Sequence, residues 1–375
     1  MQTPPDAPLK VLHFVTGGFS GATQVAVDLC LAAQASGDMQ VQLVLRRKRN
    51  TDATRVQALR DKGLDVRVVP GWSHAATIWR LRSLCKTWSP DILVAHGYSE
   101  HLWGRLAALW AGVPHLVHVE HNSRERYSFL RLRLARWLAR HTGAIVGVSE
   151  GVRSRLLELG FPPAKCLAIP NGVNVPLLES VPTPTWPKRL PQVIMASRFA
   201  RQKDPMTLIH AMRILQERHV VTRLSFAGLG KARLMKQCQK ATVQLGLSAQ
   251  VDFLGQVSGL PNLLGQHQIF VLSTHYEGMP LALIEAMAIG CACIGTDVVG
   301  VREVIEHGRT GLLVPEGDAQ ALADAIAQLL ADPVQAEHMG QAARAAVQSQ
   351  FDMRLMQARY SHLFKSLHHE LALIV

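Results

Sequence analysis

The sequence predicts an α/β protein made of two parallel sheets, each covered by helices. Short apolar runs of strand length alternate with helical stretches, and such alternation implies parallel strands joined by helical crossovers. A proline-rich segment interrupts the alternation near the middle of the chain, after which the pattern starts again. A chain of 375 residues is long enough for two ordinary domains. We therefore expect two Rossmann-like domains.

The segments of this pattern set the expected boundaries. Residues 1–178 should form the first domain and residues 192–355 the second, with a semi-extended, proline-rich hinge at 179–191 between them. Residues 356–375 are amphipathic and should belong to a last helix. Strands are expected at 10–15, 41–45, 65–69, 92–95, 116–119 and 144–148, and then at 193–196, 224–227, 251–253, 270–272, 291–294 and 312–314.

Composition narrows the classes of function. The formal net charge is +12, which attracts nucleic acid, anionic lipid or anionic substrates. The six cysteines lack disulfide-like spacing and fit a reducing compartment. The N-terminus lacks the basic region of a signal peptide, and no apolar run reaches the ~18 residues that span a bilayer. We expect a cytoplasmic protein without a transmembrane helix.

The stretch from Ser273 to Gly290 carries the strongest chemical signal. An apolar run at 269–272 predicts a buried strand, a Gly-Met-Pro turn follows, and Pro280 suits the first position of a helix. A strand, a tight turn and a helix start present several backbone N–H groups to an anion such as a phosphate. Because proline has no N–H, the expected donors are those of Gly278, Met279 and Leu281.

Two glutamates bracket this turn. Glu277 lies in the loop, where it could accept hydrogen bonds from sugar hydroxyls. Glu285 lies in an otherwise apolar helix, where a lone carboxylate is costly without donors, and ribose hydroxyls are candidate donors. The structural alternative is that Glu285 is a surface residue and Glu277 a helix-start acid favoured by the helix dipole.

The stretch resembles the E-x7-E motif of the retaining glycosyltransferases of family 4, also called group 1. Glu277 and Glu285 match the two glutamates, and the continuation through residues 291–314 is similar as well. The resemblance implies the GT-B fold, in which two Rossmann-like domains face each other across a cleft. It implies transfer of a sugar, with retention, from a nucleotide-sugar to an acceptor hydroxyl. The donor would be UDP-linked, with GDP left open, and would bind the second domain.

Two cations follow the first strand of the second half. Arg198 and Lys203 match the R-x4-K pair that holds the donor diphosphate in this family. Fixed cations beside a helix start would stabilise a departing phosphate, whereas the structural alternative is a solvated basic loop. The chain contains no D-x-D, so we expect a metal-independent enzyme that needs no cofactor. Gly228 belongs to a further candidate donor loop.

The first half contains a glycine-rich loop at residues 17–22. It is not G-x-G-x-x-G and no P-loop lysine is nearby, so dinucleotide and ATP binding are poorly supported. The loop is similar to the N-terminal G-G-A loop of the family. In one register Gly18 matches it, and in the other, which suits the following helix better, Gly21 matches it. The structural alternative is a plain strand-to-helix turn.

Histidines mark the ends of two strands in the first half. Three of them occur at intervals of three residues in segment 115–122, a spacing that points strand residues to alternate faces, so we expect no metal site. His118 should lie inside the strand. His121 and Asn122 resemble the acceptor-side H-N position of the family, and His96, which ends the preceding strand, is the alternative site histidine. Each could instead be a structural histidine.

Segment 124–141 combines apolar and basic residues. A helix here would align Tyr127, Leu130, Leu134, Trp137 and Leu138 on one face, with Arg133, Arg136 and Arg140 beside it. That composition is typical of a helix lying in an anionic membrane interface. The alternative is a helix that docks its apolar face on the sheet and solvates its arginines.

These features predict a glycosyltransferase of cell-envelope glycan, lipopolysaccharide or glycolipid synthesis. It would work at the inner face of the cytoplasmic membrane on a glycan or lipid-linked acceptor. One rival is a GT-B epimerase acting on the sugar-nucleotide itself. The other is a basic nucleic-acid-binding protein, but a binding motif is missing and aromatic residues make up only 6%, so we expect no nucleic-acid partner.

Overall fold

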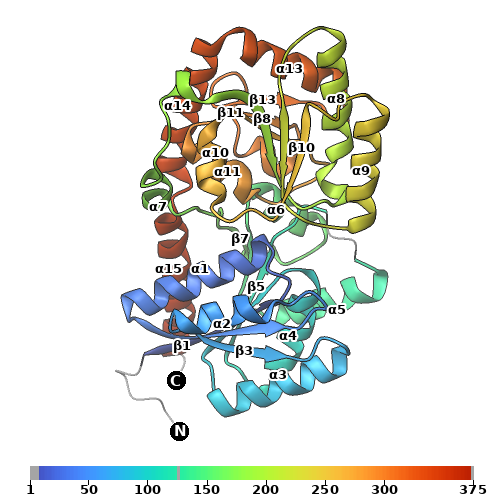
Figure 1. The fold of residues 1–375 in the computed structure, drawn as a ribbon. Coiled ribbons are helices and arrows are strands. Elements are labelled where there is room, and N and C mark those ends of the chain that lie inside the picture. Colours follow the sequence, from blue (N-terminus) through green and yellow to red (C-terminus); the bar gives the residue numbers. More distant parts are fainter. Residues whose placement is uncertain (1–7, 125–126, 373–375) are drawn as a thin grey trace. The chain divides into compact units, whose positions relative to one another are not determined.

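The chain forms two compact α/β units. The structure, a computed structural model, describes residues 8–124 and 127–372. Unit 1 comprises Met1–Asn171 and Met356–Val375, and unit 2 comprises Gly172–Leu355. Each unit contains one parallel sheet with helices on both faces (Figure 1). The predicted class, two Rossmann-like α/β domains, is confirmed.

Unit 1 is built on a seven-stranded sheet with the order β3-β2-β1-β4-β5-β6-β7. Every pairing in it is parallel. Its strands were all expected except the last, which is only three residues long and carries little periodicity. The strands are β1 (Leu9–Thr16), β2 (Met39–Arg46), β3 (Asp65–Val69), β4 (Ile92–His96), β5 (His115–Glu120), β6 (Ala144–Gly147) and β7 (Cys166–Ala168).

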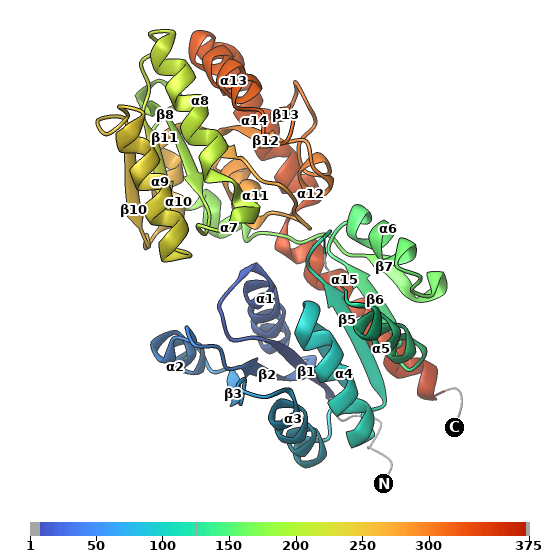
Figure 2. The same ribbon diagram turned by 90° about the vertical axis from the view of Figure 1, so that its right-hand side faces the viewer.

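Helices cover both faces of this sheet, because alternate side chains of each strand point to opposite faces. Val15 and Leu45 pack with α1 and α2, whereas Phe14 and Leu93 pack with α3 and α4 (Figure 2). Apolar side chains therefore fill most of both faces, although a few polar side chains such as His13 and His118 are buried within the strands. The helices are α1 (Gly21–Ser36), α2 (Ala53–Asp61), α3 (His74–Trp88), α4 (Tyr98–Ala111), α5 (Phe129–Arg140), α6 (Glu150–Glu158) and the 3₁₀ turn η1 (Pro163–Lys165).

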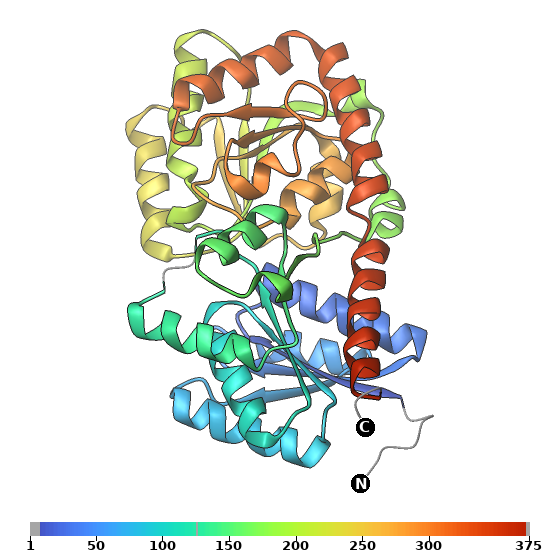
Figure 3. The same ribbon diagram turned by 180° about the vertical axis from the view of Figure 1, so that it is seen from behind.

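The last helix, α15 (Met353–Ala372), returns to unit 1 and lies beside α1 (Figure 3). Gln357 donates to the Asp28 carbonyl at 3.4 Å, and Lys365 Nζ lies 2.7 Å from Asp38 Oδ2. A cavity of about 210 Å³ separates α15 from β1 and α1. The helix expected from about Met353 to near the end of the chain is confirmed, and the described part of residues 356–375 lies within it.

Unit 2 contains a six-stranded parallel sheet with the order β10-β9-β8-β11-β12-β13. On one face α8 packs against α9 and α13, and on the other α11 packs against α10 and α14. The strands are β8 (Leu190–Ala196), β9 (Leu224–Ala227), β10 (Val251–Gly255), β11 (His267–Leu272), β12 (Ala292–Thr296) and β13 (Leu312–Val314). The helices are η3 (Arg201–Lys203), α8 (Pro205–Glu217), α9 (Ala232–Gln244), α10 (Leu260–Gln266), α11 (Leu281–Ile289), α12 (Val299–Arg302), α13 (Ala319–Ala331) and α14 (Pro333–Gln350).

The proline-rich segment differs from the semi-extended hinge that we expected. Helix α7 (Val175–Glu179) ends where the segment begins, the segment itself contains the 3₁₀ turn η2 (Trp186–Lys188), and both belong to unit 2. Trp186 is buried, and the Arg189 guanidinium donates to the carbonyls at the end of α11, at 3.1 Å from Ile289 O. Packing of this tryptophan and arginine fixes the segment, because their burial outweighs the extended preference of the prolines.

Candidate functional site

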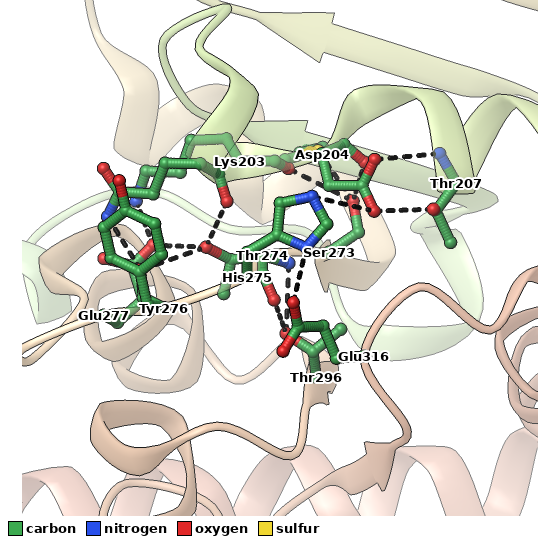
Figure 4. A network of polar contacts seen from close by, with 12 residues as sticks. Lys203, Asp204, Thr207, Ser273, Thr274, His275, Tyr276, Glu277, Thr296 and Glu316 are labelled. Atoms are coloured by element: carbon green, nitrogen blue, oxygen red, sulfur yellow. Dashed lines mark hydrogen bonds and ion pairs between the residues drawn. The ribbon is translucent and has the colours of Figure 1, made fainter. Parts of the chain in front are cut away.

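Two loops of unit 2 meet at the carboxyl ends of neighbouring strands. The turn η3 follows β8 and the loop at 273–280 follows β11, and ligands of parallel sheets bind beyond these strand ends. The His275 N–H donates to the Gln202 carbonyl at 2.8 Å, and Gln202 Nε2 donates to the Tyr276 carbonyl at 2.7 Å. The two loops are therefore hydrogen-bonded to each other and form one rim (Figure 4).

A cation–carboxylate pair lies in this rim. Lys203 Nζ forms an ion pair with Glu277 Oε1, and Thr274 Oγ1 donates to the same oxygen at 2.9 Å (Figure 4). The Glu277 side chain is 8% exposed and the Lys203 side chain 16%. Such low exposure makes the pair less screened by salt than a surface pair. The sequence predicted both residues, and the structure brings them into direct contact.

Asp204 holds the turn that carries Lys203. Its backbone is left-handed, with φ of 40°, and its Oδ2 accepts from Thr207 Oγ1 at 2.6 Å at the start of α8. The Ser273 hydroxyl donates to the Asp204 carbonyl at 2.9 Å and so ties this turn to the end of β11 (Figure 4). Asp204 was not among the residues predicted from the sequence. The Asp-Pro pair before a helical stretch is the N-cap signal that could have identified it.

The other residues that the sequence predicted for donor binding lie at the same ends of the sheet. Arg198 follows β8 and is exposed. Gly228 has φ of +137°, and a Cβ there would lie 2.1 Å from the Ser197 carbonyl oxygen. This position therefore needs glycine for a close backbone approach. A role of Gly228 in donor binding stays a prediction.

The start of α11 differs by one residue from the expectation. Pro280 is the N-cap, not the first helical residue, and its carbonyl accepts from the Leu283 N–H at 3.1 Å. Gly278 and Met279 are buried, and Glu285 is half-buried. A Cβ on Gly300 would lie 2.3 Å from the Gly278 carbonyl oxygen, so the glycine of α12 lets the loop pack tightly.

In unit 1 the glycine loop lies at the end of β1. The Gly17 N–H donates to the Arg46 carbonyl at 2.8 Å, and a Cβ on Gly17 would lie 2.8 Å from that oxygen. The nearest atom to a Cβ on Gly18 would be 3.6 Å away, and Gly21 is the exposed first residue of α1. In this loop it is therefore Gly17 whose backbone lies too close to a neighbouring strand for a side chain. Gly17 was not one of the two glycines predicted from the sequence.

A buried ionic cluster lies next to this loop. Arg46 at the end of β2 lies 3.5 Å from Glu100 at the start of α4, and Lys48 Nζ lies 3.2 Å from the same carboxylate. Arg46 also donates to Ser99 Oγ at 2.9 Å. The sequence shows only a basic loop at 46–50. Its acidic partner could not be predicted, because Arg46 and Glu100 are 54 positions apart in the chain.

Three histidines form a hydrogen-bonded row across β1, β4 and β5. His96 Nδ1 lies 3.1 Å from His121 Nε2, and His96 Nε2 lies 3.0 Å from His13 Nδ1. Burial lowers the pKa of His13 and of His121 to about 3 and that of His96 well below its usual value. All three are therefore neutral near pH 7. The two alternative site histidines, His96 and His121, are direct neighbours.

The backbones of Asn122 and His121 are both hydrogen-bonded to the side chain of Glu120. Their backbone N–H groups donate to Glu120 Oε1 at 3.3 Å and 2.9 Å. This anchor fixes the chain where it leaves β5, and the rings of His121 and His96 stack with centroids 5.4 Å apart. His121 is half-buried, whereas His96 is fully buried.

The histidines of segment 115–122 do not converge. His118 lies inside β5, as predicted, and stacks on His101 with ring centroids 3.9 Å apart. Within the described residues, His101, His118 and Glu120 form the one group of three potential metal ligands with ligand atoms within 4.8 Å of one another. Both ring nitrogens of His101 already contact protein groups, Arg105 Nη2 and the Tyr127 hydroxyl, each at 2.7 Å. We interpret this group as a packed polar core, in which His118 stacks on the hydrogen-bonded ring of His101 beside the buried Arg105 guanidinium.

The arginine-rich segment forms α5, but its faces differ from the expectation. Leu138 is buried with Ala135 and Ala139, whereas Leu130 is 75% exposed and Phe129 72% exposed. Tyr127 precedes the helix and belongs to the core around His101. Glu125 and Arg126, which the predicted segment included, lie outside the described residues.

The arginines of α5 also differ from one another. Arg133, Arg136 and Arg140 are all exposed, as is Trp137 at 41%. Arg136 is in addition held by a contact to a neighbouring segment, since it donates to the Leu159 carbonyl at 2.7 Å. The helix therefore both docks on the sheet and presents an apolar, basic outer surface. None of the helices in the described ranges combines the length and the apolarity needed to cross a bilayer.

The class of protein follows from the fold together with comparisons with known proteins. The two parallel-sheet Rossmann-like units agree with the GT-B fold that the sequence resemblance implied. A family model of the glycosyl transferases group 1 matches residues 179–346, and a model of glycosyltransferase family 4 matches residues 19–176. The chain belongs to the group 1 glycosyltransferases of family 4.

Relatives and solved structures agree with this assignment. The chain is 27% identical over 273 residues to the UDP-Gal:alpha-D-GlcNAc-diphosphoundecaprenol alpha-1,3-galactosyltransferase of Escherichia coli, covering 68% of this chain and 70% of the relative. It is 26% identical over 236 residues to the amylovoran biosynthesis glycosyltransferase AmsK of Erwinia amylovora, covering 60% and 56%. The crystal structure of HepE from Anabaena in complex with UDP-glucose superposes with a TM-score of 0.85, at 20% identity and with 96% of this chain and 100% of that chain covered.

Proposed function

We propose that this glycosyltransferase moves a sugar from a UDP-linked donor to an acceptor hydroxyl of an envelope glycan or a lipid-linked glycan, with retention at the anomeric carbon. The observation that carries the proposal is the ion pair between the half-buried Lys203 and the buried Glu277 at the rim before α11. It provides one cation for a diphosphate and one carboxylate for sugar hydroxyls. The relatives that act on a UDP-sugar or in polysaccharide synthesis support the donor and the acceptor class.

The donor would bind unit 2. Its diphosphate would accept hydrogen bonds from Lys203 and Arg198 and from the backbone N–H groups of Gly278, Met279 and Leu281 at the start of α11. Glu277 would release part of its bond to Lys203 and accept from the sugar, and Glu285 would accept from the ribose. These cations supply the charge stabilisation that a divalent metal supplies in other transferases, so the reaction would not require one.

The acceptor would bind at the strand ends of unit 1, where His121 is half-buried. In the reaction the bond between the anomeric carbon and the diphosphate oxygen breaks, and the acceptor oxygen bonds to that carbon on the same face. The acceptor proton passes to the departing phosphate oxygen. No residue of this chain is needed as a covalent nucleophile, and His121 would orient the reacting hydroxyl by a hydrogen bond.

A membrane surface is the proposed location of the acceptor. The outer surface of α5 presents Phe129 and Leu130 together with Arg133 and Arg140, which suits the interface of an anionic membrane. A lipid-linked acceptor would then be presented next to the bound enzyme. We infer a peripheral association with the inner face of the cytoplasmic membrane.

Thermal unfolding in the presence of nucleotides tests the donor. A ligand at 100 times its dissociation constant stabilises a protein by about 2.7 kcal/mol, so UDP and UDP-sugars should raise the melting temperature. A shift with GDP alone would replace UDP by GDP in the proposal. The anomeric configuration of the product, read by NMR, tests retention. Turnover of the sugar-nucleotide without any acceptor would instead indicate an epimerase.

A further inference from the structure

The row of His13, His96 and His121 is not used in full by the proposed reaction, which involves only His121. The three residues come from β1, β4 and the end of β5, and sequence separations of 83 and 25 residues divide them. Burial keeps two of them out of reach of substrate, since His96 is 0% and His13 1% exposed. Their contacts with each other are therefore the feature that needs a physical explanation.

The hydrogen-bond chemistry of neutral imidazole restricts this row. A neutral ring has one N–H donor and one bare acceptor nitrogen. The two nitrogens of His96 each face a nitrogen of a neighbouring ring, at 3.1 Å and 3.0 Å. Both contacts can be hydrogen bonds only if His96 donates to one neighbour and accepts from the other. The protons of the row must then all point the same way.

Two arrangements satisfy this condition. In one, His121 Nε2 donates to His96, His96 Nε2 donates to His13, and His121 Nδ1 is left as a bare acceptor. In the other, all bonds are reversed and His121 Nδ1 carries the proton. Mixed arrangements bring two N–H groups or two lone pairs together at a buried contact, which is costly. The tautomer of His121 thus cannot change without a change in both other rings.

We propose that His13 and His96 are positioning residues that couple the tautomer of His121 to the far end of this row, where the surroundings of His13 select one of the two arrangements. His121 then meets the substrate hydroxyl with one defined hydrogen-bonding character at Nδ1. This inference rests on the proposed function for the role of His121 in the reaction, whereas the coupling itself rests on the geometry alone. The far end of the row lies at His13, which lines the cavity beside Phe364 of α15. A change of packing at α15 would therefore reach His121 through two hydrogen bonds.

Nitrogen-15 NMR of the resting protein tests the coupling directly. Two shared protons should produce two nitrogen–nitrogen couplings across hydrogen bonds, and each ring should show a single tautomer. His267 provides an internal reference, because its Nδ1 faces the Leu263 carbonyl at 2.8 Å and must carry a proton. Absence of both couplings, or a mixture of tautomers at His121, would overturn the proposal.

A pair of variants at His13 separates positioning from folding. The side chain of His13→Asn places an amide atom where Nδ1 stands and can keep the bond to His96, whereas that of His13→Leu cannot. His13→Leu should lower kcat about tenfold, less than the loss typical of a general acid or base. It should also populate the second tautomer of His121 and leave UDP affinity unchanged. His13→Asn should restore most of the lost kcat.

The failures of the two proposals can be told apart. The NMR couplings are measured without substrate and do not depend on the reaction, so their absence overturns the row alone. Full activity in His121→Ala would overturn the role of His121 in the proposed function and with it the effect of the row on kcat. An unchanged tautomer and kcat in His13→Leu, with the same tryptophan fluorescence as wild type, would overturn the positioning role.

Discussion

The rim of unit 2 and the histidine row of unit 1 differ in charge. In unit 2 the rim contains a cation and a carboxylate in contact, Lys203 and Glu277. In unit 1 the half-buried His121 is backed by neutral rings whose pKa values are lowered by burial. A charged rim suits a diphosphate, whose charge must be balanced in the reaction. A neutral row suits a hydroxyl, which needs orientation and no change of charge.

The two sites also differ in how firmly their geometry is fixed. The ion pair of unit 2 is partly accessible and can exchange its partners for those of a ligand. The histidine row of unit 1 has no spare nitrogen at His96, so its geometry is set before any substrate arrives. One site can adapt to its ligand, and the other is preorganised.

Removal of a rim cation should have the largest effect. We expect Lys203→Ala and Arg198→Ala each to lower kcat by about 100-fold or more, because a preorganised donor to the developing phosphate charge is lost. Steady-state kinetics with the donor found by thermal unfolding would measure this. Arg201→Ala, an exposed cation in the same turn, is the matched control and should keep wild-type rates. Equal losses of kcat at all three positions would mean that the positive charge of the turn, and not the position of each cation, determines the rate.

Chelation tests whether the rim cations are sufficient without a metal ion. Activity should persist in EDTA if Lys203 and Arg198 balance the phosphate charge as proposed. Complete loss with EDTA, restored by Mg²⁺ or Mn²⁺, would contradict this expectation.

The glutamates should show a smaller, selective effect. Glu285→Ala should weaken UDP binding about tenfold, as expected for one hydrogen bond to a charged group. Glu277→Ala should instead weaken the additional affinity that UDP-sugar has over UDP. Because this variant also releases Lys203 from its ion pair, the affinity for UDP itself can change as well. Calorimetry with UDP and UDP-sugar separates the two contributions. If both variants bind both ligands as wild type does, neither glutamate contacts the donor.

The buried histidines of unit 1 should make stability depend on pH. Their folded pKa values lie below the ordinary value near 6.5, so the unfolded chain binds more protons below that pH. Their contribution is complete above pH 6.5 and is lost as the pH falls toward 3. The free energy of unfolding should fall by about 1.4 kcal/mol per pH unit for each such histidine.

Tryptophan fluorescence in urea can measure this slope, because every tryptophan except Trp186 lies in unit 1. His13→Asn should remove the share of one histidine from the slope. The control His210→Gln changes an exposed histidine and should leave the slope unchanged. A free energy of unfolding that does not change between about pH 7 and 5 would mean that water reaches the histidine row and that the pKa values are not lowered.

The smallest effect per residue is expected on α5. Each arginine near an anionic surface contributes about 1 kcal/mol, so replacing Arg133, Arg136 and Arg140 by Gln should weaken cosedimentation with anionic vesicles. Since Arg136 donates to Leu159, the double variant without it is the cleaner test. Replacing Arg233, Lys236 and Lys240 of α9 by Gln removes the same charge elsewhere and should have little effect. Equal weakening by both triple variants would assign the binding to net charge.

The sequence was most informative where the site is local in the chain. The alternation of strands and helices predicted both sheets, and segment 269–290 together with Arg198 and Lys203 predicted the rim of unit 2, because a few loops supply all of it. Direct contact between Lys203 and Glu277 could not be predicted, since it depends on β8 and β11 being neighbours. Only the strand order reveals that contact.

Unit 1 was harder to predict for the same reason. The sequence does not predict a role for His13, because a lone histidine in an apolar strand has no distinguishing pattern. Its place in the histidine row depends on β1, β4 and β5 being neighbours in the sheet. The predicted buried face of α5 was wrong in part, because helical spacing alone does not show which edge of an apolar stripe contacts the sheet. The burial of Leu138 and the exposure of Leu130 depend on the tertiary contacts of the helix.

The division of the chain has a consequence for the order of folding during synthesis. Unit 2 is one continuous segment, Gly172–Leu355, and can complete its contacts as soon as it has left the ribosome. Unit 1 needs α15, whose Phe364 packs against His13 from the opposite end of the chain. The first unit to be translated is therefore the last to be finished. During that interval the α15-facing side of β1, with one end of the histidine row, stays open to water and to chaperones.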